Sequence, residues 1–230
     1  MRTIGLLGGM SWESSIHYER IINEEVRRRL GGLHAADLLI RSYDFHEIEA
    51  LQRAGEWDLA GALLAEDARR LEVAGAEVLV LCTNTMHKVA PAIEAAITIP
   101  FLHIGDATAD AALRAGVGRV GLVGTRFTME EPFLVDHLTR RGLTVVVPGA
   151  EDRELVDRVI FDELVRGVTN PASTRSFVGV IDRLLAQGAE GVVAGCTELE
   201  LLVGPEDVTV PFFPTATIHA HAAVDAALGF

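Results

Sequence analysis

The 230-residue sequence has no uninterrupted run of eighteen apolar residues. A transmembrane helix needs about 20 predominantly apolar residues, so we expect no transmembrane helix. The first residues carry a single arginine and lead directly into a strand-like pattern, without the apolar core and small-residue cleavage site of a signal peptide. We therefore expect a cytoplasmic protein with no membrane partner.

Basic residues are scarce beside acidic ones, and the formal net charge is −13. A nucleic-acid binder would show a basic patch, and no clear one is present. The densest basic run, Arg27–Arg29, adjoins Glu24 and Glu25 and is typical of the end of a solvated helix. We expect no nucleic-acid partner, and an anionic substrate would need a local electropositive site.

Recognisable cofactor and metal motifs are also lacking. There is no CxxC, no zinc-type ligand spacing and no P-loop, and no lysine stands in a motif that suggests pyridoxal phosphate. His219 and His221 are two residues apart, but no third ligand is evident. The glycine-rich stretch Gly5–Ser11 has the spacing G-x-x-G-G instead of G-x-G-x-x-G, so we interpret it as a tight turn close to a small ligand. We predict neither a metal nor a cofactor.

What the sequence does contain is an alternation of short apolar, β-branched runs with longer helical patterns, which predicts parallel sheets covered by helices. Continuous apolar runs such as Val78–Leu81 are typical of strands buried on both faces. The expected strands are Thr3–Leu7, Asp37–Ser42, Glu77–Leu81, Ile99–His103, Arg119–Val123, Thr144–Val147, Gly191–Ala194 and Val210–Phe213. The expected helices are Ser14–Arg29, Asp58–Ala74, Asp106–Ala115, Glu130–Arg140, Asp152–Arg166, Pro171–Gln187 and Thr217–Leu228.

An internal repeat divides the chain. Short α/β units resemble one another in composition, but four matches in the same order, including the cysteines, indicate a duplication. We predict an α/β fold of two pseudo-symmetric parallel-sheet domains, residues 1–97 with the C-terminal helix 213–230 and residues 98–212, with the active site in the cleft between them. The matched segments are Ile4–Gly8 with Val120–Gly124, Gly75–Glu77 with Gly188–Glu190, Cys82-Thr83 with Cys196-Thr197, and Thr98–Phe101 with Thr209–Phe212.

The two cysteines carry the chemical prediction. Cys82 and Cys196 each follow a buried strand at the point where we expect a helix to begin, and helix N-termini favour anions and lower thiol pKa values. A lone buried cysteine more often only fills space. A duplicated pair would place two thiols on opposite sides of one cleft, as a racemase requires, with pKa values of roughly 6–8. Thr125, at the repeat-equivalent strand end, would line the same cleft.

At these residues the sequence resembles the aspartate/glutamate racemase family, in its branch of broad-specificity amino-acid racemases. The resemblance covers essentially the whole chain and rests on three motifs. These are Gly5–Ser14, Leu81–His87 and Gly195–Leu199.

The resemblance implies two pseudo-symmetric domains, a homodimer, no cofactor and paired cysteine acid/bases, Cys82 and Cys196, acting on an amino-acid substrate. It also implies a binding pocket for that substrate. Thr83, Asn84 and Thr85 would hold the α-carboxylate and amino group from one side, Thr197 and Glu198 from the other, and Met10 and Gln52 would complete the pocket.

One position departs from the pattern of aspartate-specific members. They grip the distal carboxylate with basic side chains, and here the matching position is Gln52, although Arg53 is adjacent. We therefore expect activity toward neutral amino acids as well.

Two alternatives to a racemase remain. One is an isomerase or decarboxylase of a small carboxylic acid on the same scaffold, which would not need both thiols. The other is a non-catalytic small-molecule binding protein, which would need neither. Retention of both Cys-Thr motifs favours the racemase.

Overall fold

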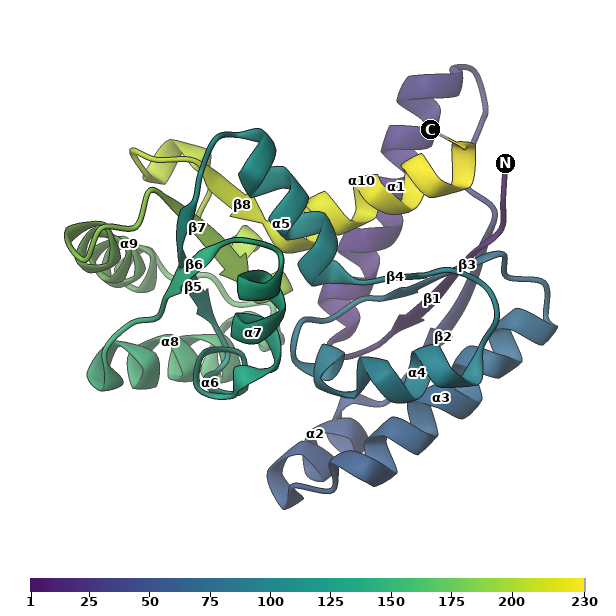
Figure 1. Ribbon diagram of the computed structural model, residues 1–230, viewed down its shortest axis with the longest axis horizontal. Coiled ribbons are helices and arrows are strands. Elements are labelled where there is room, and N and C mark those ends of the chain that lie inside the picture. The colour runs from purple at the N-terminus through teal and green to yellow at the C-terminus, as the bar shows by residue number, and fades with distance from the viewer. Residues whose placement is uncertain (230) are drawn as a thin grey trace. The chain divides into compact units, whose positions relative to one another are not determined.

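The computed structural model describes residues 1–229 and contains two sheets of four parallel strands each (Figure 1). The first sheet has the order β2-β1-β3-β4, and the second has the equivalent order β6-β5-β7-β8. This arrangement confirms the predicted fold class of two parallel-sheet α/β domains. The strands are β1 (Ile4–Gly8), β2 (Leu38–Ser42), β3 (Val78–Leu81), β4 (Phe101–Leu102), β5 (Arg119–Gly124), β6 (Thr144–Val146), β7 (Gly191–Gly195) and β8 (Phe212–Pro214).

The chain divides into two compact units. The first comprises Met1–His103 together with the stretch that begins at His219, and the second is Ile104–Ile218. This division falls six residues later than the boundary predicted after residue 97, because β4 pairs with β3 in the first sheet, with Phe101 opposite Leu79. The last helix, α10 (Thr215–Leu228), begins in the second unit and ends in the first.

In the first unit, helices cover both faces of the sheet. Side chains alternate between the two faces along each strand. One face carries Leu7, Leu79 and Leu81, and α2, α3 and α4 pack on them in a common apolar core. α1 lies on the other face (Figure 1). The helices are α1 (Trp12–Leu30), α2 (Phe45–Ala54), α3 (Trp57–Val73), the short 3-10 helix η1 (Thr85–Val89) and α4 (Ala90–Ala96).

The second unit repeats this layering. Val123, Val192 and Ala194 face a core built with α8 and α9, whereas Val120, Leu122 and Val193 face a core built with α5 and α7. Because these strands are buried on both faces, their sequences are continuous apolar runs. The helices are α5 (Ile104–Arg114), α6 (Arg126–Glu130), α7 (Pro132–Arg140), α8 (Ala150–Asp162), η2 (Leu164–Arg166), α9 (Pro171–Ala186), η3 (Thr197–Leu201) and η4 (Pro205–Asp207).

All eight expected strands are present, and each expected helix has a counterpart. The sequence prediction missed the helices α2, α4 and α6. α2 begins after Asp44, whose carboxylate accepts a hydrogen bond from the His46 N–H, and it ends at Gly55 in the left-handed conformation. The predicted helix Asp152–Arg166 is instead α8 followed by the separate turn η2.

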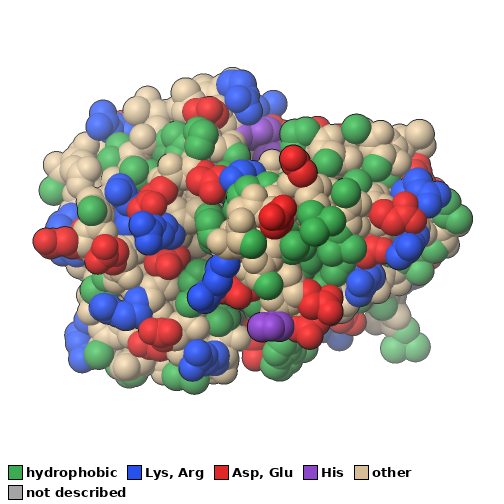
Figure 2. All heavy atoms as spheres, turned by 90° about the horizontal axis from the view of Figure 1, so that it is seen from below, with side chains coloured by type: hydrophobic (Ala, Val, Ile, Leu, Met, Phe, Trp, Pro, Cys, Tyr) green, Lys and Arg blue, Asp and Glu red, His purple; other side chains and the backbone are tan. Residues whose placement is uncertain are grey.

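Surface charge is mixed in sign. Figure 2 shows acidic and basic side chains interspersed over the visible face. Among residues 1–229, every helix is too short or too polar to cross a membrane.

Candidate active site

Cys82 directly follows β3, the central strand next to β1 in the first sheet. Its backbone N–H donates to the Leu7 carbonyl at 2.9 Å, which continues the ladder one residue past the strand. The side chain is fully buried, and the three predicted binding residues that follow it are buried as well. These three are Thr83, Asn84 and Thr85.

The backbone after Cys82 folds into a tight turn. The imidazole Nδ1 of His87 donates to the Thr83 carbonyl at 2.7 Å, and the His87 backbone N–H donates to the Asn84 carbonyl at 3.0 Å. The sequence prediction included His87 within a motif but gave it no role, because the contact depends on the turn that brings residue 87 back over residue 83.

Gln52 and Met10 lie in the same unit as Cys82. Gln52, on α2, is buried and donates from Nε2 to the Met86 sulfur at 3.1 Å. Met10 is also buried and follows β1, whose end adjoins the end of β3 in the sheet. Gln52 therefore packs behind the turn that follows Cys82 and is not a solvated residue on the surface of α2.

Cys196 occupies the corresponding place in the second unit, directly after β7. Its thiol Sγ lies 3.0 Å from Glu198 Oε2, and the Thr197 hydroxyl donates to that same oxygen at 2.8 Å. All three side chains are buried. One oxygen of the buried Glu198 carboxylate thus contacts both the thiol and the hydroxyl. The sequence did not predict this arrangement.

Thr125 follows β5, the neighbour of β7. Gly124 pairs with Gly195 in the ladder, so Thr125 and Cys196 emerge at the same edge of the second sheet. The Thr125 hydroxyl caps α6 by accepting from the Thr128 N–H at 3.3 Å. Thr125 therefore has a structural role at this edge, in addition to the binding role that the sequence predicts.

The prediction that helix N-termini lower both thiol pKa values is wrong. Burial raises the pKa of the Cys82 thiol well above its usual range. Burial, and then the charge of Glu198, raise the pKa of the Cys196 thiol. The elements after the cysteines are the five-residue 3-10 turns η1 and η3, not α-helices, so desolvation dominates.

A buried cluster of polar rings lies in the first unit, beside η1. His219 Nε2 donates to the Leu102 carbonyl at 2.8 Å, and its Nδ1 accepts from the Tyr18 hydroxyl at 3.0 Å. Burial lowers the pKa of His219 to about 4, so its imidazole is neutral at physiological pH. The His87 ring lies 4.5 Å from that of His103 and 5.9 Å from that of His219, between ring centroids.

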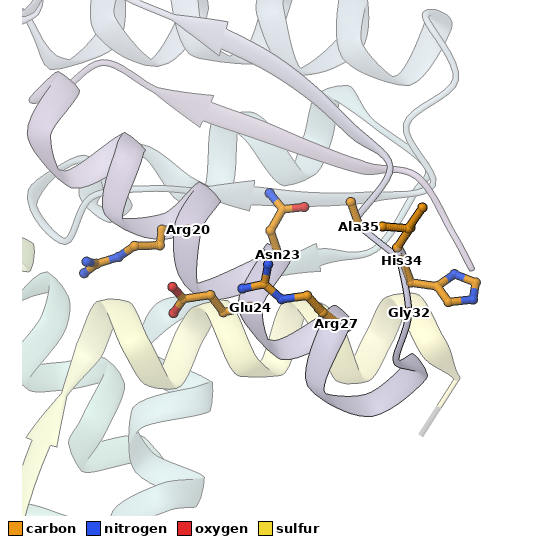
Figure 3. A pocket seen from close by; sticks show the side chains of 8 residues that line it. Arg20, Asn23, Glu24, Arg27, Gly32, His34 and Ala35 are labelled. Carbon is orange, nitrogen blue, oxygen red and sulfur yellow. The ribbon is translucent and has the colours of Figure 1, made fainter.

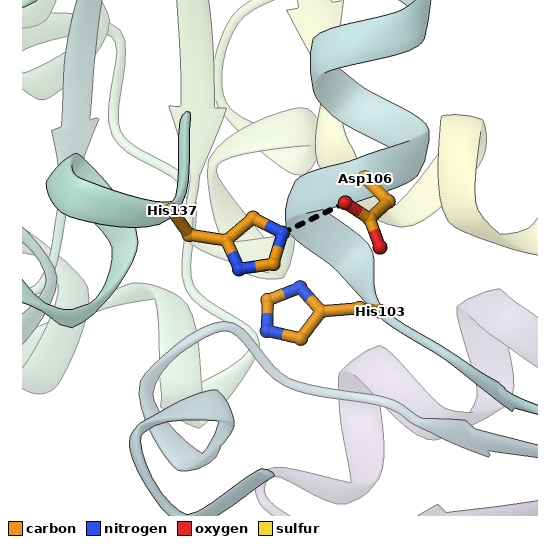
Figure 4. Close-up of side chains that lie close together, drawn as sticks. All are labelled: His103, Asp106 and His137. Carbon is orange, nitrogen blue, oxygen red and sulfur yellow. Dashed lines mark hydrogen bonds and ion pairs between the residues drawn. The ribbon is translucent and has the colours of Figure 1, made fainter. Parts of the chain in front are cut away.

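Other polar features lie away from the predicted site residues. A surface hollow of about 400 Å³ lies between α1 and the loop after it (Figure 3). In the second unit, His137 of α7 hydrogen-bonds to Asp106 of α5 at 2.8 Å (Figure 4), and Arg141 also lies 3.4 Å from that carboxylate. The hollow is lined by Arg20, Asn23, Glu24, Arg27, Gly32, Leu33, His34 and Ala35.

One family model and several solved structures match most or all of the chain. The family model for Asp/Glu/Hydantoin racemase matches residues 7–223. The crystal structure of a candidate Asp/Glu racemase from Yersinia pestis is 51% identical, with 99% of this chain and 100% of that chain covered and a TM-score of 0.93. An aspartate racemase homologue from Pyrococcus horikoshii is 34% identical, with 99% and 100% covered and a TM-score of 0.88. Arylmalonate decarboxylase, 16% identical over 100% of this chain and 94% of its own, has a TM-score of 0.51 and is similar in fold alone.

Proposed function

This chain belongs to the Asp/Glu/Hydantoin racemase family, and from that premise we propose that it interconverts L- and D-amino acids by proton transfer between Cys82 and Cys196, without a cofactor. One observation carries the proposal. Each cysteine directly follows the third strand in chain order of its own sheet, and the two sheets have equivalent strand orders. Both halves of the duplicated chain therefore have a thiol at the equivalent strand end, after β3 and after β7.

The proposed reaction needs one thiolate and one thiol. The thiolate takes the α-proton from one face of the substrate, and the electron pair of the broken C–H bond stays on the α-carbon. The thiol of the other cysteine then gives its proton to the opposite face, which inverts the configuration. After the turnover the two cysteines have exchanged protonation states, and proton exchange with solvent restores them.

Burial keeps both thiols protonated at rest, so the thiolate must form when the substrate binds. For Cys196, the Glu198 carboxylate lies 3.0 Å from the thiol and is positioned to take its proton once the bound substrate lowers the thiol pKa. The ammonium group of an amino acid would favour the thiolate further, because an opposite charge within about 4–6 Å stabilises the charged form. We propose that Thr83, Asn84 and Thr85, with Met10 and Gln52, bind the substrate from the first unit, and that Thr125, Thr197 and Glu198 bind it from the second.

Serine variants of each cysteine test the two-thiol mechanism. A serine hydroxyl is far too weak an acid to replace the thiol, so Cys82→Ser and Cys196→Ser should each lose racemisation in both directions. Each should keep α-proton exchange with deuterated water for one enantiomer only, and the two variants should prefer opposite enantiomers. Thermal unfolding of each variant controls for misfolding.

Several outcomes would overturn this proposal. Exchange of the same enantiomer by both variants, or wild-type racemisation by either, would contradict the two-thiol mechanism. Carbon dioxide release from a substituted malonate, without α-proton exchange of any amino acid, would instead indicate a decarboxylase. Loss of activity on dialysis against chelator, restored by a metal or by pyridoxal phosphate, would contradict cofactor independence.

We also propose that the protein is a homodimer. α1 exposes two large apolar side chains one turn apart, Trp12 and Ile16, and exposed apolar surface of this kind favours contact with another chain. Light scattering should give a mass twice that of the 24.8 kDa chain. A monomer mass at the concentration of the activity assay would contradict the proposal.

A further inference from the structure

We propose that His87 is a positioning residue for Cys82, acting through its hydrogen bond to the Thr83 carbonyl. The inference rests on the proposed function, since it assigns the residue that holds one of the two proposed acid/bases in place. The contact is short, at 2.7 Å between Nδ1 and the carbonyl oxygen, and His87 is only 3% exposed.

The hydrogen bond fixes the orientation of a whole peptide group. A peptide unit is planar, and its C=O and N–H point in opposite directions. When His87 holds the Thr83 carbonyl on one side, the Asn84 N–H is held on the other. The backbone N–H of Cys82 is itself bonded to Leu7 of β1. The backbone is therefore fixed at two points, at Cys82 and at the peptide group between Thr83 and Asn84.

His87 is itself held from several sides, which a positioning residue requires. Its ring centroid lies 4.5 Å from that of His103, 5.6 Å from that of Phe101 and 5.9 Å from that of His219. His219 is in turn fixed by its hydrogen bonds to Tyr18 and to the Leu102 carbonyl. An imidazole packed in this way has few alternative rotamers.

The second unit holds its cysteine by different means. The residue five positions after Cys196 is Leu201, which is 41% exposed and cannot make an equivalent bond. There, Glu198 contacts the thiol directly, and Glu200 accepts from the Ala216 N–H at 2.7 Å. The effect of His87 should therefore be confined to the Cys82 half of the reaction.

Three substitutions at residue 87 test the proposal. His87→Asn places an amide N–H near the position of Nδ1, and should still reach the Thr83 carbonyl. His87→Gln places its donor one bond farther out, and His87→Leu has none. Tyr18→Phe is the matched control, because it perturbs the same ring cluster without touching the Thr83 carbonyl.

Two measurements read the result. The chain has two cysteines, so labelling cysteine Cβ with ¹³C gives two resonances, one for each thiol. His87→Gln and His87→Leu should shift the Cys82 resonance relative to His87→Asn and leave that of Cys196 in place. α-Proton exchange should fall roughly 10- to 100-fold for the enantiomer served by Cys82 and less than about threefold for the other, with His87→Asn close to wild type, an expectation based on the cost of misplacing a catalytic group.

Equal behaviour of His87→Asn and His87→Gln would overturn the proposal, even if His87→Leu does not fold. Equal loss for both enantiomers would also overturn it, because it would show a general structural role. If the wild-type protein exchanges no amino-acid α-proton, the proposed function fails, and the cysteine resonances still decide whether His87 positions Cys82.

Discussion

The carboxylate of Glu198 lies 3.0 Å from the thiol of Cys196, whereas the residue at the same distance in sequence from Cys82 is Asn84, a neutral amide. The two thiols of the proposed racemase therefore have different surroundings despite the duplication. Burial raises the pKa of both, but only Cys196 has a carboxylate among the causes of its shift. Proton transfer by Cys82 on one face of the substrate α-carbon and by Cys196 on the other should accordingly depend on different neighbouring residues.

Glu198→Gln should separate the two halves of the reaction. Removing the negative charge removes one cause of the raised Cys196 pKa, but it also removes the acceptor for the thiol proton. We expect the second effect to dominate and racemisation to fall by about 100-fold, within the range usual for a proton-transfer group. α-Proton exchange of the enantiomer served by Cys82 should change much less, and deuterium incorporation into each enantiomer measures both. An equal fall for the two enantiomers would contradict this assignment.

The sequence predicted the framework better than the site. The short apolar, β-branched runs were sufficient to predict all eight strands, because a strand buried on both faces must be apolar along its whole length. The repeat located Cys82 and Cys196, since a duplicated motif marks equivalent strand ends. The prediction could not supply their environments. The contacts Glu198–Cys196 and His87–Thr83 depend on how short 3-10 turns fold back. These turns stand where α-helices were expected, and burial raises the pKa of both thiols.

Substrate range is the next prediction. Gln52 offers a neutral amide, and its Nε2 is directed to the Met86 sulfur. Nearby basic groups are engaged, because Arg53 pairs with Glu49 and the Lys88 ammonium lies 3.8 Å from the centre of the Trp57 ring. We therefore expect racemisation of at least one uncharged amino acid in a screen of the chiral proteinogenic amino acids by chiral chromatography. Turnover of aspartate alone would contradict this expectation.

His219 should make stability depend on pH. Its pKa is about 4 in the folded chain and about 6.5 when unfolded, so between these values the unfolded state binds more protons. The folded state is therefore destabilised as pH falls from about 6.5 toward 4, by about 2 kcal/mol at pH 5. Urea unfolding at pH 7.5 and pH 5 measures the loss.

His219→Gln is the control for this titration. Its amide can still donate to the Leu102 carbonyl, but it does not titrate. The variant should be less stable than wild type at pH 7.5, because it loses packing and the bond to Tyr18, and should lose about 2 kcal/mol less between the two pH values. Parallel loss in both proteins would show that other groups cause the pH dependence.

The close approach of β5 and β7 should make Gly124 intolerant of a methyl group. A Cβ built at Gly124 would lie 2.6 Å from the carbonyl oxygen of Gly195, the residue directly before Cys196. Backbone cannot rotate away as a side chain can, so Gly124→Ala should cost about 1–3 kcal/mol of stability, as overpacking does. It should also displace the residue that precedes the thiol, and slow exchange of the enantiomer served by Cys196 more than exchange of the other.

Gly179→Ala is the matched control, because it makes the same substitution in the same unit. Gly179 lies within α9, and the atom nearest to a Cβ there is the Arg183 side chain at 3.5 Å, an ordinary contact. Alanine is favoured over glycine within a helix by about 0.5–1 kcal/mol, so this variant should be at least as stable as wild type and equally active. Urea unfolding and enantiomer-specific exchange, measured on both variants, give the comparison. If Gly124→Ala matched Gly179→Ala in both measurements, the spacing between β5 and β7 would not be what holds Cys196 in place.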